Sequence, residues 1–201
     1  MASRPLSLPV LGAAVLGGCG APETPATEAG EGVLVPAMET SEASSAVSAF
    51  AYCDDVTTWN AAWATMEAQV LTLVNQRRAD GATCGGVAKP PVPALTLDNR
   101  LRCAARKHSK DMGTNNFMSH TGSNGSTPWQ RMNSAGYTYR SAGENVAAGY
   151  STATAVVNGW MSSTGHCNNI MNASFTQLGV GYFHAPSSTY KHYWTQDFGR
   201  P

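Results

Sequence analysis

The chain has 201 residues, a length that suits one ordinary domain with appendages and excludes a second domain of full size. Hydrophobic residues make up 42% of the sequence, which is enough for a sizeable core. Charged residues make up 13%, against roughly 25% in an average globular domain, and they cancel to a formal net charge of zero.

The net charge of zero hides an uneven distribution. The segment from Cys19 to Asp55 carries seven acidic residues and no Lys or Arg, whereas the part from Val56 onward carries twelve basic and six acidic residues. A basic domain on an acidic tether suits an anionic neighbour such as cell wall, lipid headgroups or polysaccharide. The alternative is that these charged residues only form a solvated surface and bind no partner.

Residues 1–18 have the pattern of a cleaved export signal. Arg4 precedes an apolar stretch that is too short to span a bilayer, and small residues follow it. The four residues that end at Cys19, "LGGC", resemble the bacterial lipobox, so we predict a lipid on Cys19 that anchors the chain without spanning the membrane. An ordinary secretory signal is the alternative. Because Gly20 and not Asp follows the cysteine, we expect an outer-membrane lipoprotein, or else an extracellular protein.

A disordered linker is predicted after the signal. Residues 19–53 are mostly Ala, Glu, Thr, Ser, Pro and Gly, a composition that cannot bury a core. We therefore expect the folded domain to span residues 54–201.

Two amphipathic helices are predicted at the start of the domain. Apolar residues recur at helical spacing from Trp59 to Val74, after Thr57 or Thr58 as the N-cap. The second helix follows Asp98 as its N-cap, and its apolar face includes His108. A lone His on such a face is more often a core residue than a ligand, and we expect this of His108.

The second half of the domain is predicted to end in a β-hairpin. The loop-like stretch 113–150 contains one short helix, with Thr127 as N-cap and Pro128 in the first turn, and a further helix follows Ser151. Residues 177–185 and 190–199 have the composition of paired strands. Helices followed by an antiparallel hairpin favour an α+β or layered α-β-α domain.

The cysteines predict two disulfides. Without Cys19 there are four, an even number in an exported chain: Cys53, Cys84, Cys103 and Cys167. Of the three pairings we favour Cys84 with Cys103, because the proline-rich loop 89–93 between them could bring them together. Cys53 then pairs with Cys167. A zinc site is the competing interpretation, but the sequence has no C-x-x-C spacing.

Four blocks, in this order and spacing, resemble the bacterial branch of the CAP superfamily, which includes cysteine-rich secretory proteins, antigen 5 and pathogenesis-related 1 proteins. They are "FMSHTGSNG", "AGYTYRSAGENVAAG", "GWMSSTGHCNNIMNASFTQLGVG" and "YWTQDFG". The resemblance runs from about Val70 to Phe198. It implies a three-layer α-β-α sandwich with a central antiparallel sheet.

The resemblance also implies a cavity with two His and two acidic residues. Matched position by position, His120, Glu144 and His166 are three of them. Ser163 stands where plant and animal members have the second acid, which leaves one carboxylate between two imidazoles. Asn145, next to Glu144, is expected to form hydrogen bonds with backbone groups of its loop, and a place in the cavity is the alternative.

These residues suggest several kinds of chemistry. His120, Glu144 and His166 could offer three ligands to zinc or another divalent cation and leave a position for water, although no H-E-x-x-H helix is present. Neighbours on a helix diverge by about 100°, so His166 and Cys167 cannot both face one cavity, and we predict a cavity histidine and a disulfide-bonded cysteine. A serine hydrolase that uses Ser163 is a weaker alternative, because there is no G-x-S-x-G motif.

The expected function is binding of a lipid, a cell-wall component, a protein or a divalent metal, with no firm catalytic activity. The alternative is a metal-assisted hydrolase of peptide or cell-wall bonds, with Glu144 as the base. A third is a purely structural spacer in the envelope. Nucleic acid is not an expected partner of an exported protein, and the oligomeric state does not follow from the sequence.

Overall fold

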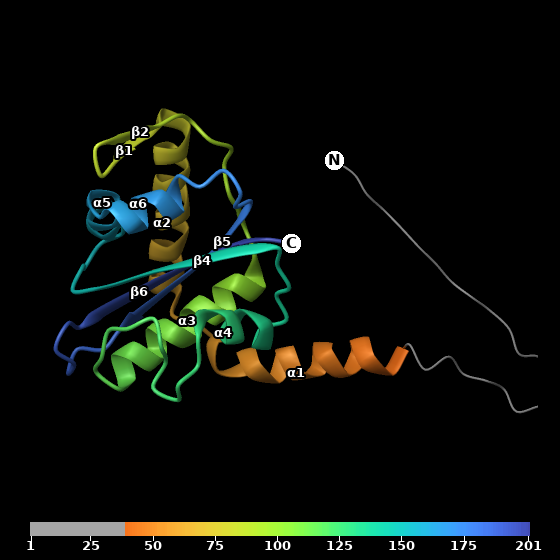
Figure 1. Ribbon diagram of the computed structural model, residues 1–201. Helices are drawn as coiled ribbons and strands as arrows, with labels where there is room; N and C mark the ends of the chain where they lie inside the picture. Colours follow the sequence, from red (N-terminus) through yellow and green to blue (C-terminus); the bar gives the residue numbers. More distant parts are fainter. Residues whose placement is uncertain (1–38) are drawn as a thin grey trace, which may run out of the picture. The chain divides into compact units, whose positions relative to one another are not determined.

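A central sheet lies between two layers of helices in the computed structural model (Figure 1). The structure describes the backbone of residues 39–201 and the side chains from residue 46, so the predicted export signal, Cys19 and most of the predicted linker lie outside the described residues. The strand order is β3-β5-β6-β4, and β5 and β6 form the predicted hairpin. The bounds are β3 (Thr96–Leu97), β4 (Ser141–Ala148), β5 (Gln177–His184) and β6 (His192–Arg200).

The predicted α-β-α sandwich is confirmed, and its sheet is antiparallel except where the two residues of β3 join β5 in parallel. The strand register aligns Gly179, Asp197 and Glu144 in one row across β5, β6 and β4. Because side chains alternate between the faces of a sheet, these three positions share the face toward one helical layer.

That layer consists of α1 (Glu39–Thr57), α3 (Asn99–Thr114) and α4 (Pro128–Ser134). The predicted N-cap of α3 is confirmed, since Asp98 accepts hydrogen bonds from the backbone N–H groups of Arg100 and Leu101. α3 lies directly on β5 because Gly179 and Gly181 have no side chain. A Cβ at either position would clash with the backbone of α3, at Leu101 and at Ala105 respectively.

The linker prediction is wrong for residues 39–53, which belong to α1. Three contacts hold this helix on the domain. Cys53 forms a disulfide, Val56 is buried, and Asp55 forms ion pairs with Lys107 and Lys110 of α3. The Ala- and Ser-rich composition of α1 gives little amphipathic signal, so the sequence pattern indicates a linker where tertiary contacts stabilise a helix.

The opposite layer consists of α2 (Ala61–Asp80), α5 (Ala153–Ser162) and α6 (Thr164–Ile170). α2 begins after Asn60, whose side chain accepts hydrogen bonds from two backbone N–H groups. The predicted N-caps, Thr57 and Thr58, are wrong because Thr57 is still the last residue of α1. Arg78, fully buried at the other end of α2, donates hydrogen bonds to the carbonyls of Pro93, Ile170, Asn172 and Phe175.

The predicted disulfide pairing is wrong, although all four cysteines are paired. The bonds join Cys53 to Cys103 and Cys84 to Cys167. Strands β1 (Ala82–Cys84) and β2 (Val87–Lys89) form a hairpin whose turn, Gly85-Gly86, has the positive φ angles that glycine tolerates. This hairpin packs against α6 and carries Cys84 there. The proline-rich loop comes after β2 and packs against the end of α2, where the Val92 N–H donates to the Arg78 carbonyl.

No helix in the described part of the chain is long and apolar enough to cross a membrane.

Gly181→Ala tests the close packing of α3 on β5. We expect the substitution to lower the free energy of unfolding by about 2–3 kcal/mol, because the new Cβ must push the backbone of α3 away from the sheet. Urea denaturation measures the change. Gly165→Ala is the matched control, since nothing lies within 4 Å of the added Cβ, and we expect it to change stability by less than about 1 kcal/mol. Equal effects of the two substitutions would contradict the packing described.

Candidate functional site

The centre of the site is the carboxylate of Glu144 on β4, which is the edge strand of the sheet. One carboxylate oxygen, Oε1, lies 2.7 Å from Nδ1 of His120, and the other, Oε2, accepts a 2.6 Å hydrogen bond from Nη2 of Arg131. The Glu144 side chain is only 1% exposed. Both of its oxygens are therefore engaged, one by an imidazole and one by a guanidinium.

His120 lies in the loop between α3 and α4, and its side chain is 53% exposed. The loop is held by Arg131, which donates hydrogen bonds to the carbonyls of Ser126 and His120 at 2.8 and 3.0 Å. Arg131 itself is placed by α4, whose predicted N-cap Thr127 is confirmed as part of a capping box with Gln130. A neutral His120 that donates Nδ1–H to Glu144 leaves Nε2 as the free ring nitrogen.

His166 reaches the same edge of the sheet from α6, in the opposite layer. Burial is the main reason why its pKa lies below the usual histidine value, and the positive charge of a protonated His120 lowers this pKa further. The two imidazoles therefore lie close enough for their charges to interact, and they disfavour simultaneous protonation.

Asn145 forms hydrogen bonds that hold α6 in place. It is fully buried, and its side chain points to the face opposite Glu144, as expected for the next residue on a strand. Its Nδ2 donates to the carbonyl of His166, and its Oδ1 accepts from Asn169. The same Asn169 Nδ2 also lies 3.3 Å from the carbonyl of Glu144. The hydrogen bond to the carbonyl of His166 agrees with the expectation that Asn145 bonds backbone groups, and its cavity role stays a prediction.

The neighbouring predictions have different outcomes. Cys167 is buried in its disulfide, so the expectation of a structural cysteine next to His166 is confirmed. Ser163 occupies the N-cap position of α6 without forming a capping hydrogen bond. No contact in the described residues joins its hydroxyl to Glu144 or His120, and its cavity role stays a prediction.

Asp197 is a second buried acid that sequence reasoning missed. Its carboxyl group is fully buried opposite Glu144 on the neighbouring strand, and its oxygens have no hydrogen-bond partner among the described residues. Burial and the charge of Glu144 raise the pKa of Asp197 well above the ordinary value. For Glu144, burial alone would raise the pKa, but the hydrogen bond from His120 and the charge of Arg131 lower it overall. The surroundings of the pair therefore favour the ionised form of Glu144 and disfavour the ionised form of Asp197.

The predicted three-ligand metal site does not fit this arrangement. Among the described residues no three His, Cys, Asp or Glu side chains are grouped so that they could hold a metal ion. Both oxygens of Glu144 are already in hydrogen bonds, so this residue is not free to coordinate. The two imidazoles of His120 and His166 remain as candidate ligands, and the carboxylate of Glu144 orients His120 through its Nδ1.

His108 is a core residue, as predicted. It is fully buried, its Nε2 lies 2.7 Å from the carbonyl of Ser119, and its Nδ1 has no partner among the described residues. Burial lowers the pKa of His108 to about 4. Because Ser119 precedes His120, this neutral imidazole helps to fix the loop that carries the exposed histidine.

Known proteins resemble this chain in sequence and in fold. The model of the cysteine-rich secretory protein family, CAP, matches residues 71–198. YkwD, an uncharacterized protein of Bacillus subtilis, is 37% identical over 132 residues, which are 66% of this chain and 46% of that protein. The chain spans less than half the length of the two curated relatives, both from Bacillus subtilis, that it matches.

Two solved structures show the same fold. An extracellular SCP-domain protein of Bacillus anthracis has a TM-score of 0.57 at 33% identity, with 68% of this chain and 41% of that chain covered. An outer surface protein of Borrelia burgdorferi has a TM-score of 0.53 at 20% identity, with 66% of this chain and 92% of that chain covered.

The buried neutral His108 predicts a pH-dependent loss of stability. Below its unfolded pKa of 6.5 the unfolded chain binds a proton that the folded chain does not bind until about pH 4. The free energy of unfolding therefore falls as the pH decreases through this window, by up to about 3 kcal/mol from this residue. Urea denaturation at several pH values measures the fall. His108→Gln should remove this part of it, and an unchanged pH dependence in the variant would contradict the assignment.

Proposed function

Because the chain belongs to the cysteine-rich secretory protein family, CAP, we propose that it is an exported binding protein whose His120–His166 pair recognises a cell-wall ligand. The observation that supports this most directly is the hydrogen bond between His120 and Glu144, with Arg131 on the far oxygen. It fixes the exposed imidazole of His120 in one orientation, within electrostatic range of His166.

The charges around the imidazoles favour a polar ligand over a strongly ionic one. The negative charge of Glu144 is balanced by Arg131 at 2.6 Å, and burial raises the pKa of Asp197, which disfavours a second negative charge. Neutral imidazoles can accept hydrogen bonds from hydroxyl or amide groups and donate through their N–H groups. Hydroxyl and amide groups are the polar groups of polysaccharide and peptide, and a cell-wall polymer contains both.

Binding fits the geometry better than the alternative of a hydrolase with Glu144 as the base. A general base must come within hydrogen-bond reach of the proton that it removes. The Glu144 side chain is 1% exposed, and both of its oxygens already accept hydrogen bonds within the protein. In this arrangement Glu144 positions His120 and does not reach a substrate.

Export and anchoring complete the proposal. The relative from Bacillus anthracis is described as extracellular and the one from Borrelia burgdorferi as an outer surface protein, which supports export of this chain. The lipobox-like sequence at Cys19 would add a lipid anchor in the outer membrane. The acidic, Pro-containing stretch between Cys19 and α1 would then let the domain reach the wall.

A divalent cation is a second candidate for the imidazole pair. Metal-binding histidines commonly donate their other ring N–H to a carboxylate, as His120 does to Glu144. His120 and His166 would be the protein ligands, and the cation would supply open positions for a ligand's oxygen atoms. The lowered pKa of His166 favours the neutral form that a metal requires.

Sedimentation with purified peptidoglycan sacculi tests the proposal. We expect the purified protein to co-sediment. We expect His120→Ala and His166→Ala each to weaken binding about tenfold, because each variant loses one hydrogen bond to a charged or strongly polar group. His184→Ala is the matched control, because this histidine lies at the end of β5, away from Glu144.

The same assay with EDTA or ZnCl₂ separates the two candidates. Binding that survives EDTA supports direct recognition, whereas binding that EDTA abolishes and zinc restores supports the cation. The cell-wall proposal would be refuted if the protein failed to co-sediment with sacculi both with and without zinc. Equal binding of the His120→Ala and His184→Ala variants would refute it too.

A further inference from the structure

Two of the five histidines belong neither to the candidate site nor to the core. His184 ends β5 and His192 begins β6, on either side of the turn that joins the two strands (Figure 1). The strand register places these two residues directly opposite each other. Side chains at such positions share one face of the sheet, with their Cβ atoms about 4.5–5.5 Å apart. The hairpin therefore brings two imidazoles side by side.

The two imidazole rings are stacked and only partly buried. Their centroids lie 4.8 Å apart, and their planes are 14° from parallel. A metal ion bonds imidazole nitrogens at about 2.0–2.1 Å, so two nitrogens on one ion lie about 3 Å apart. Rings at the observed separation need only small rotations about their side-chain bonds to present one nitrogen each to the same ion.

Tyr182 orients the ring of His192. Nδ1 of His192 lies 2.7 Å from the hydroxyl oxygen of Tyr182. Tyr182 is 3% exposed and packs against Trp194 and Trp63, at ring-centroid distances of 4.2 and 6.0 Å. When Nδ1–H donates to this hydroxyl, Nε2 keeps the lone pair that a metal ion binds. A metal-binding histidine commonly has such a partner on its other ring nitrogen, because that hydrogen bond fixes the ring.

The surroundings of the pair leave room for further ligands of a metal ion. His184 also lines a hollow of about 360 Å³ beside the turn, together with Pro186 and Ser187. Among the described residues no third His, Cys, Asp or Glu joins the two histidines. Water, or an oxygen or nitrogen atom of an external molecule, would therefore complete the coordination.

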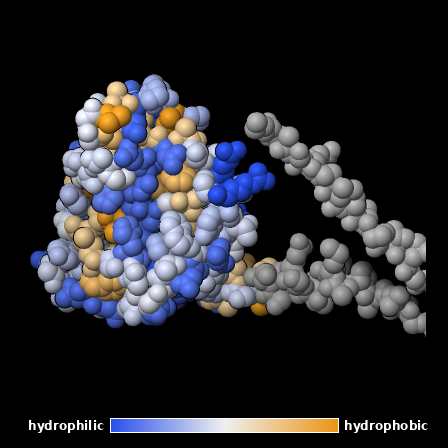
Figure 2. All heavy atoms as spheres, viewed as in Figure 1, coloured by the Kyte–Doolittle hydropathy of each residue, from blue (hydrophilic) through white to orange (hydrophobic). Residues whose placement is uncertain are grey.

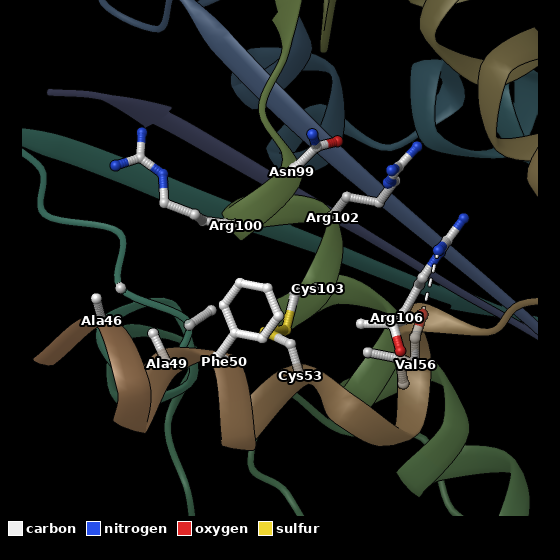
Figure 3. A pocket seen from close by; sticks show the side chains of 13 residues that line it. Ala46, Ala49, Phe50, Cys53, Val56, Asn99, Arg100, Arg102, Cys103 and Arg106 are labelled. Carbon is white, nitrogen blue, oxygen red and sulfur yellow. Dashed lines mark hydrogen bonds between the residues drawn. A yellow bond between two sulfur atoms is a disulfide. The ribbon is translucent and has the colours of Figure 1, made fainter. Parts of the chain in front are cut away.

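The larger groove between α1 and α3 does not suit a cation. α1 exposes hydrophobic side chains beside it (Figure 2), such as Phe50. Figure 3 shows the centre of the groove, where Phe50 lies over the Cys53–Cys103 disulfide. None of the described residues that line it is His, Asp or Glu, and three are arginines from α3: Arg100, Arg102 and Arg106. The His184–His192 pair is the better cation site.

Two imidazoles are few protein ligands, and this number favours one metal. For a given set of nitrogen and oxygen ligands, copper(II) binds more tightly than the other divalent ions of the first transition row, zinc included. Copper(II) also accepts a planar arrangement of nitrogen and oxygen atoms, which two imidazoles and water can supply.

We propose that His184 and His192 bind a copper(II) ion at the tip of the β5–β6 hairpin, through one ring nitrogen of each. The site is separate from the His120–His166 pair. Asp197 lies opposite Glu144, and the stretch of β6 from His192 to Asp197 is about 16 Å long at the rise of a β-strand.

Titration with CuSO₄ tests the proposal on the full, untagged chain with Cys19→Ser, so that no lipid or affinity tag interferes. Calorimetry at pH 7.4 measures the affinity, and pulsed EPR counts the imidazoles on the copper. We expect two imidazoles on the tightest-bound equivalent, and an affinity at least about tenfold higher than that for zinc. His184→Gln and His192→Gln should each weaken binding at least about tenfold and leave one imidazole on the copper.

Three further variants locate the ion and test the role of Tyr182. Tyr182→Phe keeps the ring but removes the hydroxyl, and it should weaken binding about tenfold while two imidazoles stay on the copper. Tyr193→Phe is the matched control, because it removes a hydroxyl that bonds Asn116 on the other face of β6, and we expect no change. His120→Ala should also leave copper binding unchanged, which separates this site from the proposed function.

Several outcomes would overturn the proposal. They are one imidazole or none on the copper of the unsubstituted histidine pair, zinc binding as tight as copper binding, or equal effects of Tyr182→Phe and Tyr193→Phe. A two-imidazole signal that disappears in His120→Ala and persists in His184→Gln would assign the copper to the His120–His166 pair and would also refute it.

Discussion

The candidate site depends on one buried ion pair, between Arg131 and Glu144. Their side chains are 4% and 1% exposed and lie 2.6 Å apart. A buried pair of this kind is costly to break, because the loss of one partner leaves an uncompensated charge, typically about 3–5 kcal/mol. Arg131 also holds the carbonyls of Ser126 and His120, so the same guanidinium that neutralises the carboxylate fastens the loop that presents the imidazole.

The sheet and its helices supply the geometry around this pair. Glycines at positions 179 and 181 let α3 lie on the sheet, and the register of β4, β5 and β6 then aligns Glu144 and Asp197 under the same layer. Asn145, the next residue on β4, points to the other layer and holds the backbone of α6 at His166. Adjacent residues of one edge strand thus position the two histidines from opposite sides of the sheet.

Local sequence signals predicted the elements that have strong caps or strong alternation. Asp98 before α3, Thr127-Pro128 before α4 and the β5–β6 hairpin are of this kind. Helix α1 was missed because its stability comes from Cys53 and Asp55 contacts that no local pattern contains. The disulfide partners were misassigned because the Gly85-Gly86 turn, and not the proline-rich loop, directs Cys84. His120, Glu144 and His166 came from the family resemblance, whereas Arg131 and Asp197 become functional candidates only through the fold.

The account makes Glu144 a residue that orients His120 and not one that touches a ligand. Nitrogen-15 NMR of the histidine side chains tests this most directly. At neutral pH the His120 ring should carry its proton on Nδ1 in a slowly exchanging hydrogen bond, and Arg131→Gln should make that proton exchange faster. A His120 ring protonated on Nε2 alone, or one that exchanges equally fast with and without Arg131, would contradict the account.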